Sequence, residues 1–261
     1  MNIKYNISIL AVICGLLYTF ASAAAIVSLS EAIDKAGRQR MLTQRMLKNY
    51  CQIGQNIRSQ LAKKELASAI SLFDSQLKEL KEFSSNTQVT DALSTIQKIW
   101  SPIKANLNKD PEKNTTIQLH GLIENLLVLS HQAVTLLEKD GSNSGNALVN
   151  LSGRQRMLSQ RIASLYLMKS WGLTNKAINL NYDTAINEFE EAQKQLSVSS
   201  LNTQQINDGL KNVKRQYKRF KFNTEAAKNA QLQGLIVSSL EKILIEMNRI
   251  TGLYKALEES K

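Results

Sequence analysis

The sequence predicts an all-α protein built from two tandem antiparallel four-helix bundles that are related by a pseudo-two-fold axis. Three observations predict it. The string Gly-Arg-Gln-Arg-Met-Leu at Gly37–Leu42 recurs at Gly153–Leu158. Further matches keep the same offset of 116 residues. Apolar residues recur at three- and four-residue steps in a chain with only two prolines and 6% aromatic residues, which is typical of long amphipathic helices.

The shared offset defines two homologous units. The wider copies of the motif, AGRQRMLTQRM and SGRQRMLSQRI, are identical at eight of eleven positions. Phe73 matches Phe189 and Leu80 matches Leu196 at the same offset. We therefore predict one unit over residues 27–139 and a second over 140–261. The Gly/Ser/Asn-rich run at 139–145 marks the boundary between them.

Each unit is expected to contain four helices joined by polar turns. In the first unit, Ile70, Phe73, Leu77 and Leu80 show the helical spacing well. Pro102 is expected to bend or end the third helix early. We also consider a fourth helix that continues almost directly into the fifth. The predicted ranges are 29–61, 64–83, 89–107 and 116–137, then 147–171, 175–196, 203–228 and 230–258.

The N-terminus is typical of a secretory signal peptide over residues 1–23. Lys4 precedes an apolar run at 7–20, and Ala21-Ser22-Ala23 fits the small-residue cleavage rule. Cleavage predicts a periplasmic protein without a transmembrane helix. The alternative is an uncleaved helix that anchors the chain in the inner membrane, because the apolar stretch continues to Val27. Cleavage would remove Cys14 and leave Cys51 as the one remaining cysteine, and we expect Cys51 to be a packing residue.

The net charge of +11 suggests an anionic partner. Basic residues are spread along the chain without a nucleic-acid motif, so we expect no nucleic acid. No nucleophile–base pair, acid–base carboxylate pair, haem motif or phosphate loop stands out, so we expect no cofactor and no enzyme activity. His120 and His131 lie about 16 Å apart along one helix, and we expect no metal site.

The repeated motif divides into two helical faces. Arg40 and Arg156 lie on mostly apolar or small-residue stripes, and neither has a carboxylate one turn away in its own helix. A buried guanidinium without a partner is costly, so both arginines need one. The stripe residues in the two units are Ala36, Gly37, Thr43 and Gln44, and Ser152, Gly153, Ser159 and Gln160.

These patterns predict a site for a planar oxyanion. Arg40 and Arg156 are expected to face each other over a small cavity, each offering a rigid fork of donors. Thr43, Ser159, Gln44 and Gln160 would add neutral donors, while the small residues at 36, 37, 152 and 153 would let another backbone approach. The alternative is that both arginines pair with a carboxylate of a neighbouring helix, such as Glu124 or Glu241.

The other motif arginines are second-rank candidates. Arg38 has Asp34 four residues earlier, which predicts an ion pair. The same face is expected to be solvated or salt-bridged in both units, at Arg38, Arg45, Arg154 and Arg161.

At these two motifs the chain resembles the sensor domain shared by PilJ-type chemotaxis transducers of type IV pili and NarX-type nitrate/nitrite sensor kinases. The resemblance implies a four-helix fold. It also implies an arginine of the first helix that binds nitrate at a dimer interface, which falls on Arg40 and Arg156. The preceding small residues fall on Ala36, Gly37, Ser152 and Gly153.

The chain departs from that family pattern, because the family usually continues into a transmembrane helix and a signalling domain. Two units in one chain would supply both arginines, in a monomer with a pseudo-dimeric site or in a homodimer. We therefore expect a periplasmic sensor of nitrate or nitrite that passes its state to a separate membrane receptor or chemoreceptor. The alternative is a helical interaction module or scaffold for a type IV pilus or chemoreceptor system without a small ligand.

Overall fold

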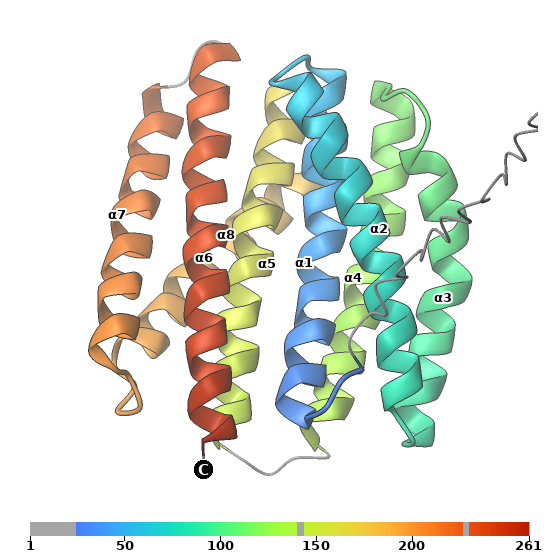
Figure 1. Cartoon of the computed structure of the whole chain (residues 1–261). Helices are drawn as coiled ribbons and strands as arrows, with labels where there is room; N and C mark the ends of the chain where they lie inside the picture. Colours follow the sequence, from blue (N-terminus) through green and yellow to red (C-terminus); the bar gives the residue numbers. More distant parts are fainter. Residues whose placement is uncertain (1–24, 140–143, 227–229, 261) are drawn as a thin grey trace, which may run out of the picture.

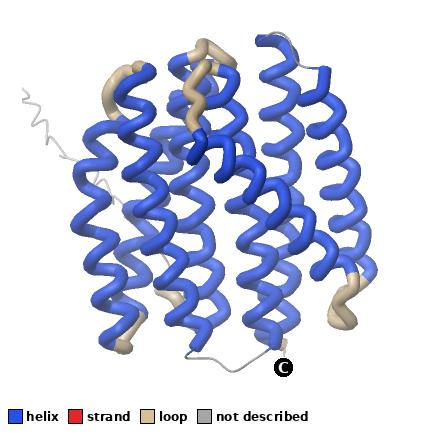
Figure 2. Tube along the Cα trace, turned by 180° about the vertical axis from the view of Figure 1, so that it is seen from behind, coloured by secondary structure: helices blue, strands red, loops and turns tan. Residues whose placement is uncertain are grey.

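The computed structural model describes residues 25–139, 144–226 and 230–260, and this part of the chain contains helices and no strand (Figures 1 and 2). The predicted signal peptide and most of the predicted junction lie outside the described residues. The eight helices are α1 (Leu29–Gly54), α2 (Ser59–Phe83), α3 (Thr87–Leu107), α4 (Lys113–Lys139), α5 (Ser144–Ser170), α6 (Lys176–Ser197), α7 (Gln204–Ala226) and α8 (Ala230–Glu259).

The two motif helices lie side by side at the centre of the molecule. Figure 1 shows α1 and α5 between the other helices, with α2, α3 and α4 on one flank and α7 and α8 on the other. Contacts along the pair advance in the same direction, from Arg40–Asn150 through Gln44–Ser164 to the end of both helices. The two motif helices are therefore parallel, and each also packs against the helices of its own unit.

The repeat predicted from the sequence is present in the packing. Phe73 on α2 packs on Trp100 of α3, with ring centroids 4.4 Å apart. The matching pair in the second unit, Phe189 and Tyr217, has centroids 4.7 Å apart. Two tandem helical bundles related by a pseudo-two-fold axis follow from this arrangement, as the sequence predicted.

Side-chain caps explain where several helices begin. The Ser28 hydroxyl accepts the backbone N–H of Glu31 at the start of α1. Asn86 caps α3, and Asn175 caps α6 by accepting the Ile178 N–H at 2.8 Å. Each cap satisfies a backbone donor that has no partner inside its helix.

Helix α1 ends earlier than the predicted residue 61. It stops at Gly54, and the following turn holds Asn56 and Arg58 at positive φ angles of 53° and 52°. A Cβ on Gly54 would lie 2.1 Å from a ring carbon of Trp171. The last turn of α1 can therefore pack against Trp171 only because residue 54 is a glycine. Trp171 is a packing residue.

Pro102 lies inside α3 and does not end the helix early, and the predicted end at residue 107 is confirmed. The helix continues to Leu107, and the Asn106 side-chain amide donates to the Pro102 carbonyl at 2.9 Å. Pro102 is exposed, while Trp100, Ile103 and Leu107 on the opposite face are buried. We attribute the continuation to this apolar face, whose burial outweighs the lost backbone hydrogen bond.

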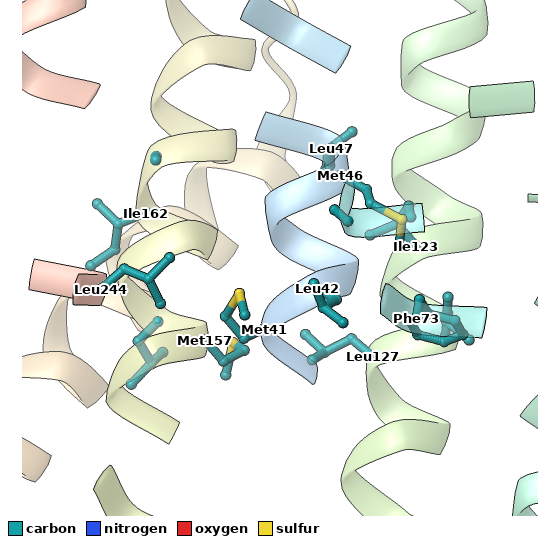
Figure 3. Packing of buried hydrophobic residues seen from close by; sticks show 14 of the residues in the cluster. Met41, Leu42, Met46, Leu47, Phe73, Ile123, Leu127, Met157, Ile162 and Leu244 are labelled. Carbon is teal, nitrogen blue, oxygen red and sulfur yellow. The ribbon is translucent and has the colours of Figure 1, made fainter. Parts of the chain in front are cut away.

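The two bundles share one hydrophobic core. Met41 of α1 and Met157 of α5 point toward one another, and Leu42 faces Leu127 of α4 (Figure 3). Cys51 is fully buried in this core, as expected of a packing residue. None of the helices in the described ranges is both long enough and apolar enough to cross a bilayer.

Candidate functional site

The structure brings Arg40 of α1 and Arg156 of α5 together at the interface of the bundles. Each residue is only 1% exposed. A Cβ on Gly37 would lie 3.3 Å from Arg40 Nη2 and 3.5 Å from Arg156 Nη2, and Gly153 is approached by the same two groups. Both guanidiniums therefore lie over the two motif glycines.

The two glycines have a different role from the one that the sequence suggested. The groups that approach Gly37 and Gly153 are guanidiniums, whereas we had expected another backbone. A side chain at either position would crowd these groups, because the Gly153 contact with Arg156 Nη2 is already 3.1 Å. Ala36 and Ser152 beside them are buried, and the Ser152 hydroxyl donates to the carbonyl of Val149.

Arg156 has a carboxylate partner from the other unit. Its Nη2 lies 2.7 Å from Asp34 Oδ1 of α1, and its Nη1 donates to Asn248 of α8 at 3.4 Å. Asp34 also pairs with Arg38 at 3.0 Å, as predicted. Burial opposes ionisation of Asp34, but Arg156 and Arg38 outweigh it and lower the pKa of this carboxyl. The positive charge of Arg156 is therefore largely compensated.

Arg40 has neutral partners. Its Nη2 donates to Asn150 Oδ1 at 2.6 Å, and its Nη1 lies 3.1 Å from Nδ1 of His131 on α4. Among the described residues it forms no direct ion pair with a carboxylate, and its Nε has no hydrogen-bond partner. Glu138 is reached through Asn150, to which its carboxyl group is hydrogen-bonded.

Asp34 and Asn150 occupy equivalent positions of the repeat, 116 residues apart. Each contacts the arginine of the other unit, so one arginine meets a carboxylate and the other an amide. Burial, followed by the charges of Arg156 and Arg154, lowers the pKa of Arg40 to about 9. Arg40 is thus charged at neutral pH and lacks a direct counter-ion among the described groups.

The predicted helper residues are buried near the arginines, and three of the four form other hydrogen bonds. The hydroxyls of Thr43 and Ser159 each donate to a backbone carbonyl of their own helix at 2.8 Å. The Gln44 amide contacts Glu124 and accepts from Ser164. Gln160 is fully buried, and neither of its side-chain polar atoms has a partner within the described structure.

The second-rank arginines all form ion pairs, and those of Arg45, Arg154 and Arg161 are with neighbouring helices. Arg45 pairs with Glu241 of α8 at 2.8 Å, and Arg161 pairs with Glu124 of α4 at 2.6 Å. Both pairs connect one unit with the other. The alternative that the arginines pair with a carboxylate of a neighbouring helix is confirmed for Arg156, whose partner is Asp34 of α1 and not Glu124 or Glu241. Arg40 has no such carboxylate partner among the described residues.

A lateral cavity of about 210 Å³ opens between α4, α5 and α6, and we call it the Arg40 cavity. The side chains around it that matter here are Arg40, Leu127, His131, Arg154, Met157 and Thr184. Arg154 lines it while paired with Glu188 at 3.0 Å. Arg40, which is buried and has no direct carboxylate partner among the described residues, therefore lines this cavity.

A second cavity of about 580 Å³ lies in the equivalent place of the first unit, and we call it the Asn248 cavity. Its residues include Arg38, Met41, Arg45, Ser68, Leu72 and Asn248. Arg38, Met41, Arg45 and Ser68 match Arg154, Met157, Arg161 and Thr184 at the repeat offset. Arg156, however, does not line the Asn248 cavity.

Sequence reasoning missed Asp34, Asn150, His131 and Asn248 as neighbours of the arginine pair. The 116-residue offset could have indicated Asp34 and Asn150, because it aligns these two residues, an aspartate and an asparagine, at the same position of the repeat. His131 and Asn248 lie on α4 and α8, and no pattern in the chain indicated that they face the motif helices.

His131 gives the site a pH-dependent stability. Burial and the charges of Arg40 and Arg154 lower the pKa of His131, despite Glu188. In the unfolded chain a histidine titrates near its ordinary pKa of about 6.5. As the pH falls through that value, the unfolded state takes up protons before the folded state does, so the free energy of unfolding decreases.

Urea denaturation at pH 7.5, 6.5 and 5.5 measures this effect. We expect His131→Asn, which copies the Asn248 position, to lose less stability than the wild type over the same range. His120, whose pKa is also lowered by burial, accounts for the remaining change. An unaltered pH dependence in His131→Asn would contradict the assignment.

The fold and the site together define a class of protein: a helical module with a buried basic centre between two repeated bundles. Within the described residues, no group of three histidine, cysteine or carboxylate side chains could hold a metal ion. The two buried guanidiniums provide the hydrogen-bond donors that an anion-binding site needs.

The family follows from comparison with known proteins. The model of the family "PilJ: Type IV pili methyl-accepting chemotaxis transducer N-term" matches the chain twice, over residues 24–122 and 140–244. These segments cover most of the sequence, and the chain belongs to this family of sensory helical domains, with two copies in tandem. No curated protein and no solved structure matched the chain.

Proposed function

We propose that this protein is a non-catalytic, periplasmic sensory protein that binds a small oxyanion, nitrate or nitrite first, at Arg40. The observation that carries the proposal is a fully buried guanidinium whose direct partners are an amide and an imidazole. A charge taken out of water is stabilised by a counter-charge, and a bound anion would supply one. In this proposal the bound state is passed to a separate membrane receptor of a chemoreceptor system.

The charges around the site favour a monovalent anion. Arg156 is already compensated by Asp34, and Arg154 by Glu188. Arg40 has no direct carboxylate partner among the described residues, but Glu188 lines the Arg40 cavity and Glu138 is hydrogen-bonded to Asn150 beside Arg40. A second negative charge on the ligand would therefore be repelled, which favours nitrate or nitrite over sulfate or phosphate.

Isothermal titration calorimetry tests the proposal with nitrate, nitrite, sulfate and phosphate at constant ionic strength. We expect nitrate or nitrite to bind with a dissociation constant on the order of micromolar, and Arg40→Gln to abolish binding. Arg45→Gln is the matched control, because it removes an arginine of the same motif that pairs with Glu241. Absence of heat with all four anions, from protein with a helical circular dichroism spectrum, would contradict the proposal.

The second candidate is an interaction module without a small ligand, favoured by the exposed basic surface of α7. Lys214, Lys218 and Arg219 are exposed there, next to Phe222, which is 72% exposed. Cross-linking to a partner that is lost when these three cations are replaced by glutamate, with no anion bound, would support this candidate.

A further inference from the structure

The Arg40 cavity has more room and more apolar wall than a four-atom anion needs. Its volume of about 210 Å³ compares with a share of about 30 Å³ per water molecule in the liquid. Leu127 and Met157 in its wall are 8% and 7% exposed. Val128, which also lines the cavity, is 64% exposed. A ligand with an apolar part would cover these side chains.

The same wall also contains polar groups. Arg40 and His131, whose side chains are 3.1 Å apart, both contribute to it. Arg40 Nε has no partner in the described structure, so the guanidinium retains donor capacity for an incoming acceptor. A carboxylate matches a guanidinium fork with two oxygens. Six of the nine lining residues are polar or charged, and Leu127, Val128 and Met157 form the apolar part of the wall.

We propose that the Arg40 cavity binds a small aliphatic monocarboxylate, whose carboxylate contacts Arg40 and whose carbon chain packs along Leu127 and Met157. This inference rests on the proposed function, because it uses the same anion-binding arginine, and it widens the ligand class from inorganic oxyanions to short organic acids. Glu188 in the wall disfavours dicarboxylates in the same way as it disfavours sulfate.

The repeat provides an internal comparison. In the first unit the Asn248 cavity is larger, but Arg156 does not line it and Asp34 already compensates that arginine. At Arg156 the carboxylate of Asp34 already supplies a counter-charge, whereas the equivalent Asn150 beside Arg40 supplies none. The chain therefore binds one monocarboxylate, in the second cavity and not in the first.

Titration calorimetry with formate, acetate, propionate and butyrate tests this inference, with chloride keeping the ionic strength constant. We expect the affinity to rise by about fourfold with each buried methylene until the cavity is filled. Thr184→Trp should weaken butyrate binding at least tenfold by filling the Arg40 cavity. The matched control is Ser68→Trp, the equivalent exposed position in the Asn248 cavity, and it should leave binding unchanged.

The outcomes separate this inference from the proposed function. Nitrate binding without any carboxylate binding overturns the inference and leaves the function in place. Butyrate binding without nitrate binding supports the inference and corrects the choice of nitrate. Equal affinities for formate and butyrate overturn it, as does equal weakening by Thr184→Trp and Ser68→Trp. If no anion of either kind binds, both the inference and the function fail.

Discussion

Replacing Arg156 by methionine is expected to lower the free energy of unfolding by about 3 kcal/mol, while the same change at Arg40 should alter it by less than about 1 kcal/mol. The difference follows from their partners. Without Arg156, the buried Asp34 keeps only Arg38 as a direct cationic partner among the described side chains. Without Arg40, an amide and an exposed imidazole lose a hydrogen bond, and a buried charge is removed.

Urea denaturation of the two methionine variants, in buffer without nitrate or carboxylates, measures this difference. Methionine suits both positions because it replaces the aliphatic stem of arginine with a flexible apolar side chain of comparable length. Equal destabilisation by the two substitutions would mean that Asp34 does not distinguish the two arginines. A larger loss at Arg40 would mean that its neutral partners stabilise it more than we infer.

Exchanging the two equivalent partner residues should have the largest effect on ligand binding. Asn150→Asp places a carboxylate beside Arg40, where the amide oxygen now lies 2.6 Å from Nη2. The new carboxylate competes with the ligand for the guanidinium, and we expect anion affinity to fall about 100-fold, the scale of a lost charge-assisted hydrogen bond. The gain of a counter-ion by Arg40 is opposed by the loss of the amide that is hydrogen-bonded to Glu138 and by repulsion between the two carboxylates, so ligand affinity is the readout of this variant.

The reciprocal variant Asp34→Asn is the matched control. It removes the carboxylate from Arg156 and should lower the melting temperature. It should leave the number of anions bound per chain at one in calorimetry, because Arg156 does not line the Asn248 cavity. Unchanged affinity in Asn150→Asp would show that the anion does not bind at Arg40. A stoichiometry of two in Asp34→Asn would show that Asp34 alone keeps an anion away from Arg156.

Much of the architecture could be predicted because the repeat and the helical period are local properties of the chain. The 116-residue register predicted two units, and the spacing of apolar residues predicted eight helices. The ends of the helices were less accurate. The end of α1 depends on the close packing of Gly54 against Trp171, and α3 continues through Pro102 because its buried face is apolar. Neither packing contact can be read from its own segment.

The residues of the candidate site were also predicted only in part. The helical face identified Arg40 and Arg156 as the two arginines of the motif that would be buried, and the structure places both at the centre. The expected donors Thr43 and Ser159 instead hydrogen-bond to their own helices. A helical projection gives the face of a side chain, but not whether its hydroxyl is satisfied by the carbonyl one turn earlier.

The sequence by itself determined the fold class, the duplication and the pair of arginines that need a counter-charge, because periodicity and register are carried by neighbouring residues. The tertiary structure alone decided that the two arginines differ. Asp34 meets Arg156 and Asn150 meets Arg40 only because α1 and α5 pack in parallel across the pseudo-two-fold. Electrostatic compensation depends on distances of a few ångströms, and residues more than one hundred positions apart acquire such distances only in the folded protein.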